Sequence, residues 1–357
     1  MMQAPEAPPF ARPVIVGDGQ MALVLADILA TTLATTLAGA REGAGPARIG
    51  ILSPFEADAR ALATTRCSPR LPGFELPACV EVSADASILA GADLVVCAIP
   101  TQFIRGTFAR IAAELPRETP IVSVSKGIEL DTFRLPCDIL AELAPGRPLA
   151  ALSGPTIAAE LARRLPAALV AASPDETLAH RLQAAFTAPW TRIYHSGDMT
   201  GVELAGACKN VIAIAAGVVD GMTLGMNTKS ALLARGLAEI ARIGVALGGR
   251  LETFFGVAGV GDLATTCFAP EGRNRSFGER LARGAAVADA LASTTSVVEG
   301  VPTARALMLV ARERGIDLPI CAAVEAMVYD GLRPADALAG LMRRETGTER
   351  IGPDDAA

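Results

Sequence analysis

The sequence predicts two domains, an α/β domain with a Rossmann-like parallel sheet followed by an all-α domain. From residue 13 to about residue 197, short apolar runs typical of strands alternate with helical stretches. After residue 197 the strand signals stop and long helical segments follow. The 357 residues are enough for two domains of ordinary size, and 51% are apolar, so both domains can bury a core.

The first domain, the α/β domain, is expected to span residues 13–197. Its predicted strands are short and apolar, and helical patterns lie between them, which indicates a parallel sheet covered on both faces. The strands are predicted at residues 13–16, 48–52, 93–99, 120–124, 149–152 and 167–171, and three of the helices at 21–37, 103–115 and 157–164.

The second domain, the helical domain, is expected to span residues 198–345. The Pro-rich residues 1–12 are expected to form a disordered lead-in, and the polar residues 346–357 a loose tail. The helices of the second domain are predicted at residues 202–219, 229–247, 275–282, 303–314 and 322–329.

Composition argues against several classes of protein. No run of 18 apolar residues indicates a membrane-spanning helix, and the first twelve residues lack the pattern of a signal peptide. Seven scattered cysteines without a C-x-x-C, and only two histidines, predict neither a metal site nor a disulfide framework, so a reducing cytoplasm is expected. The net charge is −6 and no basic stripe is visible, so nucleic acid is not an expected partner.

A phosphate-binding turn is predicted where the first strand meets the first helix. Residues 17–22 read G-x-G-x-x-A, and this position favours a dinucleotide site over an ordinary glycine turn. Gly17 and Gly19 let the backbone approach a pyrophosphate, and the helix N-terminus offers free N–H groups. Asp18 suits a phosphate neighbour only if its side chain points away.

The choice between NAD and NADP stays open. In this fold a carboxylate at the end of the second strand binds the ribose of NAD. Ser53 stands there instead, which favours NADP, although Glu56 lies close enough in sequence to reach back.

Lysine is rare in this chain. Of 32 basic residues only Lys126, Lys209 and Lys229 are lysines. Lys209 lies in an apolar helical run with small neighbours, where burial would lower its pKa towards the range of an acid or base. A lysine that extends from a core helix to solvent is the alternative. Lys126 follows a strand of the predicted sheet, where ligands bind, but a solvated loop cation explains it equally well.

Three further segments carry polar residues at turns. Gly154 and Thr156 follow a strand and precede a helix, where they suit an oxygen ligand or an ordinary N-cap. Asp262 lies in a Gly-rich turn, and Arg273 and Asn274 in a second turn that could grip a phosphate or form a helix cap with a surface ion pair.

Taken in order, these segments resemble the bacterial type of NAD(P)-dependent glycerol-3-phosphate dehydrogenase. The resemblance runs from about residue 14 to residue 331. Its motifs are the turn at residues 17–22, SKG at 125–127, LSGP at 152–155, the Lys209-Asn210 helix, ARGLAE at 234–239, GVGDL at 259–263, RNR at 273–275 and VVEG at 297–300.

The resemblance implies an oxidoreductase with its active site between the two domains. Such enzymes interconvert dihydroxyacetone phosphate and sn-glycerol 3-phosphate, a phospholipid precursor, with NADP or NAD. The resemblance also implies that Lys209 is the proton donor and acceptor, and that Lys126 and Asp262 are further catalytic residues. The implied cofactor-binding residues are Gly17, Gly19, Gln20, Met21, Lys126, Ala158, Arg273, Val297 and Glu299, and the implied substrate-binding residues are Lys126, Gly154, Thr156, Lys209, Asp262, Gly272, Arg273 and Asn274.

The chain departs from the family at three places. Gln20-Met21 replaces a pair such as Ser-Trp, Gly272 replaces an alcohol, and the connection at residues 31–47 is longer than usual.

Two alternative functions are less consistent with the residues. A related dehydrogenase acting on a ketopantoate or hydroxyacyl substrate is disfavoured by the Arg273-Asn274 turn, and a nucleotide-sensing protein without catalysis is disfavoured by Lys126 and Lys209. The expected partner is a small phosphorylated substrate, with no membrane insertion, and analogy suggests a homodimer.

Overall fold

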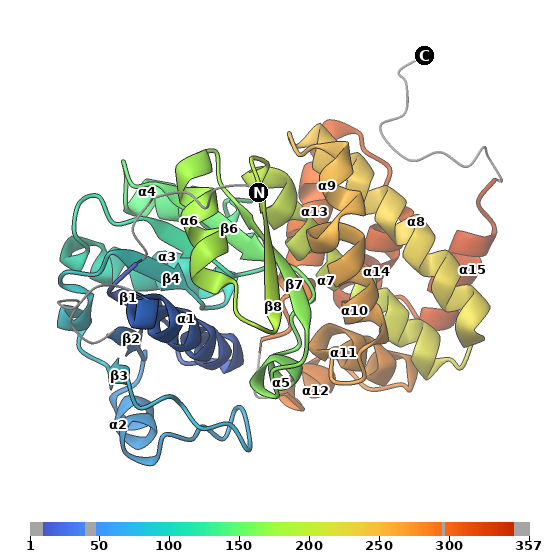
Figure 1. Ribbon diagram of the computed structural model, residues 1–357. Coiled ribbons are helices and arrows are strands. Elements are labelled where there is room, and N and C mark those ends of the chain that lie inside the picture. Colours follow the sequence, from blue (N-terminus) through green and yellow to red (C-terminus); the bar gives the residue numbers. More distant parts are fainter. Residues whose placement is uncertain (1–9, 40–47, 295–296, 346–357) are drawn as a thin grey trace. The chain divides into compact units, whose positions relative to one another are not determined.

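The computed structural model describes residues 10–39, 48–294 and 297–345, which fall into two compact units (Figure 1). The α/β unit consists of the described parts of Met1–Ile99, Phe103–Ser125 and Cys137–Met199. The helical unit consists of the described parts of Pro100–Gln102, Lys126–Pro136 and Thr200–Ala357. Two short segments from the first half of the chain therefore pack with the helical unit, a grouping that no sequence pattern indicated.

The α/β unit is built on one eight-stranded sheet with the order β3-β2-β1-β4-β5-β6-β7-β8. All neighbouring strands are parallel except β6 and β7, which pair antiparallel. The prediction of a parallel sheet is thus confirmed for five of the six predicted strands, and the sixth, β7, runs antiparallel to β6. The strands are β1 (Pro13–Val16), β2 (Ile49–Leu52), β3 (Val80–Ser83), β4 (Leu94–Cys97), β5 (Ile121–Ser123), β6 (Leu149–Ser153), β7 (Ala167–Ala172) and β8 (Thr191–Ser196).

The two strands that were not predicted are β3 and β8. Both lie at the edges of the sheet, and both carry polar or charged residues on partly exposed faces, as in the sequences VEVS and TRIYHS. The six predicted strands are more apolar and lie inside the sheet, where both faces are covered.

Helices cover both faces of this sheet. One apolar cluster joins the sheet to α1 (Gln20–Gly39), α5 (Ala158–Ala162) and α6 (Glu176–Phe186). A second cluster on the other face joins it to α3 (Thr101–Ile111) and α4 (Pro136–Leu143). The remaining elements are α2 (Glu56–Thr65), η1 (Ala86–Leu89) and η2 (Ala112–Glu114).

The residues just before β1 are anchored to this unit. Phe10 is only 1% exposed and belongs to the core, and the backbone N–H groups of Ala11 and Arg12 donate to Asp93. The expectation of a disordered lead-in is therefore wrong for residues 10–12. Residues 1–9 and the tail at 346–357 lie outside the described part of the chain, as do residues 40–47 of the long connection.

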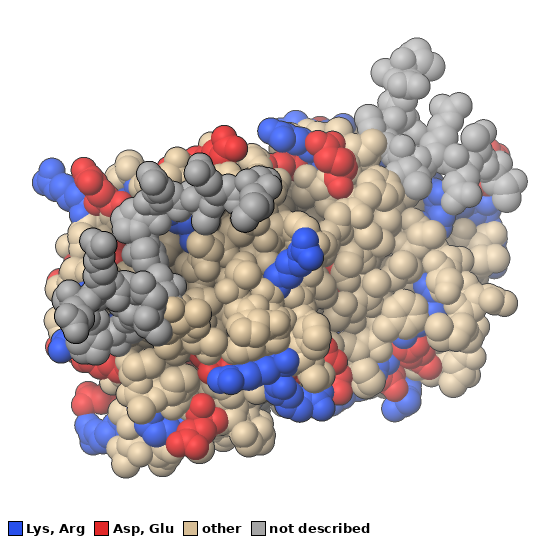
Figure 2. Space-filling view, viewed as in Figure 1, with Lys and Arg blue, Asp and Glu red and all other residues tan. Residues whose placement is uncertain are grey.

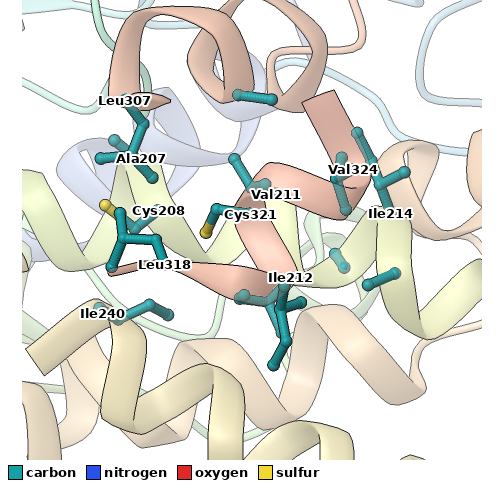
Figure 3. Packing of buried hydrophobic residues seen from close by; sticks show 14 of the residues in the cluster. Ala207, Cys208, Val211, Ile212, Ile214, Ile240, Leu307, Leu318, Cys321 and Val324 are labelled. Atoms are coloured by element: carbon teal, nitrogen blue, oxygen red, sulfur yellow. The ribbon is translucent and has the colours of Figure 1, made fainter. Parts of the chain in front are cut away.

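The helical unit is built around α7 (Met199–Gly221), which is buried from Gly201 to Val219. Its apolar side chains, among them Val211, Ile212 and Ile214, pack with those of neighbouring helices (Figure 3). By length and composition α7 alone among the described helices could cross a membrane, but all of its apolar window is buried within the protein. It is therefore the core helix of this unit.

The other helices pack around α7. As predicted, the described chain has no strand after β8. These helices are α8 (Gly225–Ala246), α9 (Leu251–Phe255), α10 (Asp262–Phe268), α11 (Arg273–Ala282), α12 (Val287–Ala292), α13 (Gly300–Arg314), α14 (Pro319–Tyr329) and α15 (Pro334–Met342), and the π-helical turn η3 (Val257–Gly261) precedes α10.

Glycines let α7 and α11 approach each other closely. A Cβ at Gly217 would lie 1.8 Å from the carbonyl oxygen of Arg275, and one at Gly278 would lie 2.0 Å from that of Ile214. Because neither contact is possible for a larger residue, these helices meet backbone to backbone. This contact places polar side chains of α7 and α11 within hydrogen-bond reach of one another.

Figure 2 shows basic and acidic side chains near one another at several places close to the margins of the view, with uncharged residues over much of the rest. Among the described residues, no group of three or more His, Cys, Asp or Glu could hold a metal ion. All seven cysteines are free thiols, five of them buried.

Candidate active site

Two lysines share one buried carboxylate in the helical unit. Lys209 Nζ lies 2.6 Å from Asp262 Oδ1, and Lys126 Nζ lies 2.7 Å from Asp262 Oδ2. The Thr266 hydroxyl lies 2.6 Å from Lys209 Nζ. The three residues predicted as catalytic are therefore in direct contact, although 136 positions separate the first from the last.

Burial controls the protonation of this group. Lys209 is 6% exposed and Asp262 1%. Burial lowers the pKa of Lys209 to about 8, against the opposing effect of the Asp262 carboxylate and with a contribution from the positive charge of Lys126. Lys209 can therefore both give and take a proton near neutral pH, which an exposed lysine does poorly.

The local structure positions each of these groups. Lys209 projects from the middle of α7, in a stretch of small side chains. A Cβ at Gly259 would lie 2.1 Å from the carbonyl oxygen of Phe254, so only glycine permits the tight π-helical turn that delivers Asp262 to the start of α10. Thr266 follows one helical turn later.

Asparagine side chains hold the surrounding segments together. Asn210 donates from Nδ2 to the carbonyl oxygen of Lys126 at 3.0 Å, and so fixes the backbone after β5 beside α7. Asn274 donates to Asn210 Oδ1 and accepts from Gly300 N–H, both at 2.9 Å. Asn274 is thus a structural link between α7, α11 and α13, and only its second amide hydrogen is left for the predicted contact with a substrate phosphate.

The predicted phosphate-binding residues lie at the start of α11. Gly272 is the N-cap and Arg273 the first helical residue, so free N–H groups and a guanidinium occur together. The Arg273 side chain is exposed and donates to the carbonyl oxygen of Val297 at 3.2 Å. Arg273 and Val297, both predicted at the cofactor, are therefore neighbours.

A partly buried carboxylate lies beside a threonine in the same unit. Glu299 Oε1 accepts from the backbone N–H of Thr101 at 2.9 Å, while Glu299 Oε2 and the Thr101 hydroxyl are buried without a hydrogen-bond partner. A Cβ at Gly127 would lie 2.7 Å from that hydroxyl and 2.8 Å from Oε2. Burial raises the pKa of Glu299 to about 7. Unpaired buried polar atoms are costly, so this pair is suited to a ligand with its own polar groups.

The predicted phosphate-binding turn has the geometry that a dinucleotide needs. Gly17 has φ +113° and approaches β4 so closely that a Cβ would lie 2.7 Å from the carbonyl oxygen of Ala98. Gly19, at the start of α1, would meet nothing within 4 Å. The first glycine makes the turn and the second keeps space open above the helix N-terminus. The residues present therefore fit a pyrophosphate.

The side chains around this turn differ from the expectation. The Asp18 carboxylate is buried and accepts from the Ser53 hydroxyl at 2.7 Å and from Arg70 at 3.3 Å. Glu56 is exposed and pairs with Arg60 instead of reaching back to the end of β2. The next two residues of the turn, both predicted at the cofactor, are Gln20, which donates to the backbone carbonyl of Arg70, and Met21, which packs partly buried against the core.

A further group of predicted site residues follows strand β6. Gly154 has φ +144°, and the Thr156 hydroxyl donates to its carbonyl oxygen at 3.1 Å. The N-cap of α5 is Ile157, without a side-chain hydrogen bond, so neither Ser153 nor Thr156 caps this helix. Ala158 is the first residue of α5 and is buried. The roles predicted for Gly154, Thr156 and Ala158 stay predictions.

Three residues of these clusters were given no role in the sequence analysis. Thr266, Thr101 and Asn210 contact predicted site residues directly. The spacing of Thr266 could have indicated its place in the site, since it follows Asp262 by four residues and therefore lies on the same helix face. Lys229, the lysine without a role, is buried and paired with Asp220 at 2.7 Å. Arg275 also binds Asp220, so this second cluster links α7, α8 and α11.

Comparisons with known proteins cover both units of the chain. Residues 14–179 match the family model of the NAD-dependent glycerol-3-phosphate dehydrogenase N-terminus, and residues 198–339 match that of its C-terminus. A glycerol-3-phosphate dehydrogenase [NAD(P)+] from Streptomyces griseus is 43% identical over 296 residues, 82% of this chain and 88% of the relative. One from Thermobifida fusca is 45% identical over 285 residues, which cover 79% of this chain and 85% of the relative. The crystal structure of glycerol-3-phosphate dehydrogenase from Coxiella burnetii superposes with a TM-score of 0.86 at 29% identity, covering 94% of this chain and 100% of that one.

Proposed function

Because this chain belongs to the family of NAD-dependent glycerol-3-phosphate dehydrogenases, we propose that it interconverts dihydroxyacetone phosphate and sn-glycerol 3-phosphate with Lys209 as the acid–base group. The cofactor is NAD or NADP. The single observation that carries the assignment of Lys209 is its contact with Asp262 in a buried site, where its pKa falls to about 8.

Reduction of a ketone needs a hydride at carbon and a proton at oxygen. The reduced nicotinamide, when bound, supplies the hydride. Lys209 supplies the proton in this direction, and as a neutral amine it removes the hydroxyl proton in the other. A group with a pKa near the working pH serves both directions, and arginine could not, because it does not deprotonate.

Asp262 and Lys126 make Lys209 suitable for this task. Asp262 accepts from both ammonium groups and so orients Lys209, while the charge of Lys126 favours loss of the Lys209 proton. A second ammonium group beside the reacting oxygen also stabilises the negative charge that develops there. Lys126 is therefore proposed to contact substrate as well as to tune Lys209.

The substrate phosphate is proposed to bind at the start of α11. Arg273 offers two parallel hydrogen bonds to a phosphate, and the N–H groups that follow Gly272 offer more. Asn274 positions this turn through its bonds to α7 and α13. Gly154 and Thr156 are proposed to contact the substrate from the end of β6. These assignments rest on the positions matched to the family.

The cofactor is proposed to bind at two groups of residues. Gly17, Gly19, Gln20 and Met21 form the phosphate-binding turn of the α/β unit. The second group consists of residues at positions matched to the family, namely Lys126, Ala158, Arg273, Val297 and Glu299. Within the second group, the unpaired Glu299 Oε2 and Thr101 hydroxyl suit the polar atoms of a ligand.

We further propose that the enzyme acts in the cytoplasm as a homodimer, and that its glycerol 3-phosphate feeds phospholipid synthesis. Light scattering of the purified full-length chain would give the molar mass in solution. A mass of one chain across the working concentration range would contradict the dimer.

A spectrophotometric assay tests the reaction itself. The full chain is mixed with dihydroxyacetone phosphate and NADH, then NADPH, and loss of the reduced-nicotinamide absorbance is followed. We expect turnover with at least one cofactor, and none when unphosphorylated dihydroxyacetone or ketopantoate replaces the substrate at the same concentration. Turnover of ketopantoate without turnover of the phosphorylated ketone would contradict the proposal.

A further inference from the structure

Asp18 is a buried carboxylate in the phosphate-binding turn that has no part in the proton transfer. Its carboxylate accepts from the Ser53 hydroxyl at 2.7 Å, and Ser53 directly follows the last residue of β2. The backbone N–H of Ser53 bonds to Ser83 at the end of β3, so its position in the sheet is fixed. Asp18 thus places a carboxylate at the carboxyl end of β2, although it belongs to the turn after β1.

This is the position at which dinucleotide-binding folds distinguish their cofactors. A carboxylate at the end of the second strand accepts from a ribose hydroxyl of NAD, whereas NADP needs a cation there for its 2′-phosphate. The residues that follow β2 in this chain, 53–55, include no acid, and Glu56 is directed to Arg60. Asp18 is therefore the carboxylate that stands in the expected place.

Arg70 could favour a 2′-phosphate, but two carboxylates already bind its guanidinium. Its NH1 donates to Asp18 Oδ2 at 3.3 Å and its NH2 to Asp58 Oδ2 at 2.9 Å. Gln20 also bonds to its backbone carbonyl, which ties the Arg70 loop to the start of α1. One guanidinium between two carboxylates leaves a net negative charge, which repels a phosphate dianion.

The carboxylate also keeps one acceptor atom for a ligand. Within the described residues, both hydrogen bonds to Asp18 end on Oδ2 and Oδ1 accepts none. A ribose hydroxyl that donates to Oδ1 would complete the hydrogen bonding of this buried group, and a phosphate in its place has no proton to offer.

We propose that Asp18 makes this enzyme select NADH over NADPH, by accepting from the adenosine ribose and by repelling a 2′-phosphate together with Asp58. The inference rests on the proposed function and adds to it the choice of cofactor. It replaces the weak preference for NADP that the absence of an acid at Ser53 suggested.

Direct binding measurements test this without any turnover. Titration calorimetry or quenching of NAD(P)H fluorescence gives Kd values for NADH and NADPH, and competition gives those for adenosine 5′-monophosphate and adenosine 2′,5′-bisphosphate. We expect the wild-type protein to bind NADH at least about tenfold more tightly than NADPH, and the monophosphate more tightly than the bisphosphate. Asp18→Asn keeps the shape, removes the charge and frees Arg70, so the NADPH to NADH ratio of Kd values should fall at least about tenfold.

Glu56→Gln is the matched control, since it removes an exposed carboxylate close in sequence to the same strand end, and should leave the ratio within about twofold. Equal or tighter binding of NADPH by the wild-type protein would overturn this inference but not the proposed function. This result does not depend on whether Asp18→Asn folds. An effect of Glu56→Gln without an effect of Asp18→Asn would also overturn it. Failure to bind either cofactor would overturn the proposed function as well.

Discussion

Lys209 Nζ lies 2.6 Å from Asp262 Oδ1, with both side chains nearly inaccessible to solvent. The protonation of such a buried lysine depends on its carboxylate partner, which favours the charged form. Because Lys126 shares that partner, the protonation of Lys209 depends on three groups that come from α7, α10 and the segment after β5.

Ketone reduction should lose activity at alkaline pH. The Lys209 pKa lies at about 8, below the 10.5 of a free lysine, and the proton donor must carry its proton. The rate of reduction should therefore fall as pH rises through about 8, and the rate of glycerol 3-phosphate oxidation should rise over the same range. Profiles of kcat against pH in both directions check this. Parallel changes in the two directions would argue against a lysine acid–base group.

Asp262→Asn should move this profile. The substitution removes the group that favours the charged form of Lys209, while burial remains, so the alkaline loss of reduction should begin at lower pH. At neutral pH, kcat should fall at least about tenfold.

Asp220→Asn is the matched control for Asp262→Asn. Asp220 also holds two cations in the helical unit, Lys229 and Arg275, but it lies outside the proposed site. We expect a lower melting temperature and an unchanged pH profile. A shift of the profile in this control would mean that the effect of Asp262→Asn is a general effect of charge or stability.

Arg273→Ala should weaken the binding of the substrate phosphate. Loss of a guanidinium–phosphate contact should raise KM for dihydroxyacetone phosphate about 10- to 100-fold, because hydrogen bonds to charged groups contribute about 1.5–3 kcal/mol. The Arg273 side chain is exposed, so the melting temperature should change little. Arg283→Ala, at the other end of α11, serves as the control. An unchanged KM for Arg273→Ala would place the phosphate elsewhere.

The two glycines of the phosphate-binding turn should respond differently to the same change. Gly17→Ala meets the backbone of Ala98 and requires a left-handed φ, so it should lower the free energy of unfolding by about 1–3 kcal/mol. Gly19→Ala meets no protein atom and should leave stability nearly unchanged, but its methyl group takes space needed by the cofactor phosphates. Denaturation curves and Kd values for NADH would show this contrast. Normal NADH affinity of Gly19→Ala would remove this turn from the cofactor site.

Much of the fold could be predicted because its signals are local. Buried strands of a parallel sheet are short apolar runs, and all six that were predicted exist. The edge strands β3 and β8 lack this signal because polar side chains face solvent. The reversed direction of β7 has no local signal either, since a buried strand has the same composition in a parallel and an antiparallel pair.

The candidate site could be predicted only as separate pieces. Lys209 was singled out by rarity and apolar surroundings, and Asp262 by its glycine turn. Their contact spans 53 positions and depends on how α7 and α10 pack, which no pattern within one segment reveals. The same holds for Asp18, whose partner Ser53 lies 35 residues away.

The most direct test of the central claim compares Lys209→Ala and Lys209→Arg with the wild-type protein. Single-turnover reduction of dihydroxyacetone phosphate is measured at neutral pH, with the Kd for the reduced cofactor determined on the same samples. Both variants should lose turnover while cofactor binding stays within a few-fold of wild type, because arginine keeps the charge but cannot exchange a proton. Turnover near the wild-type rate in either folded variant would contradict the assignment of Lys209 as the proton donor.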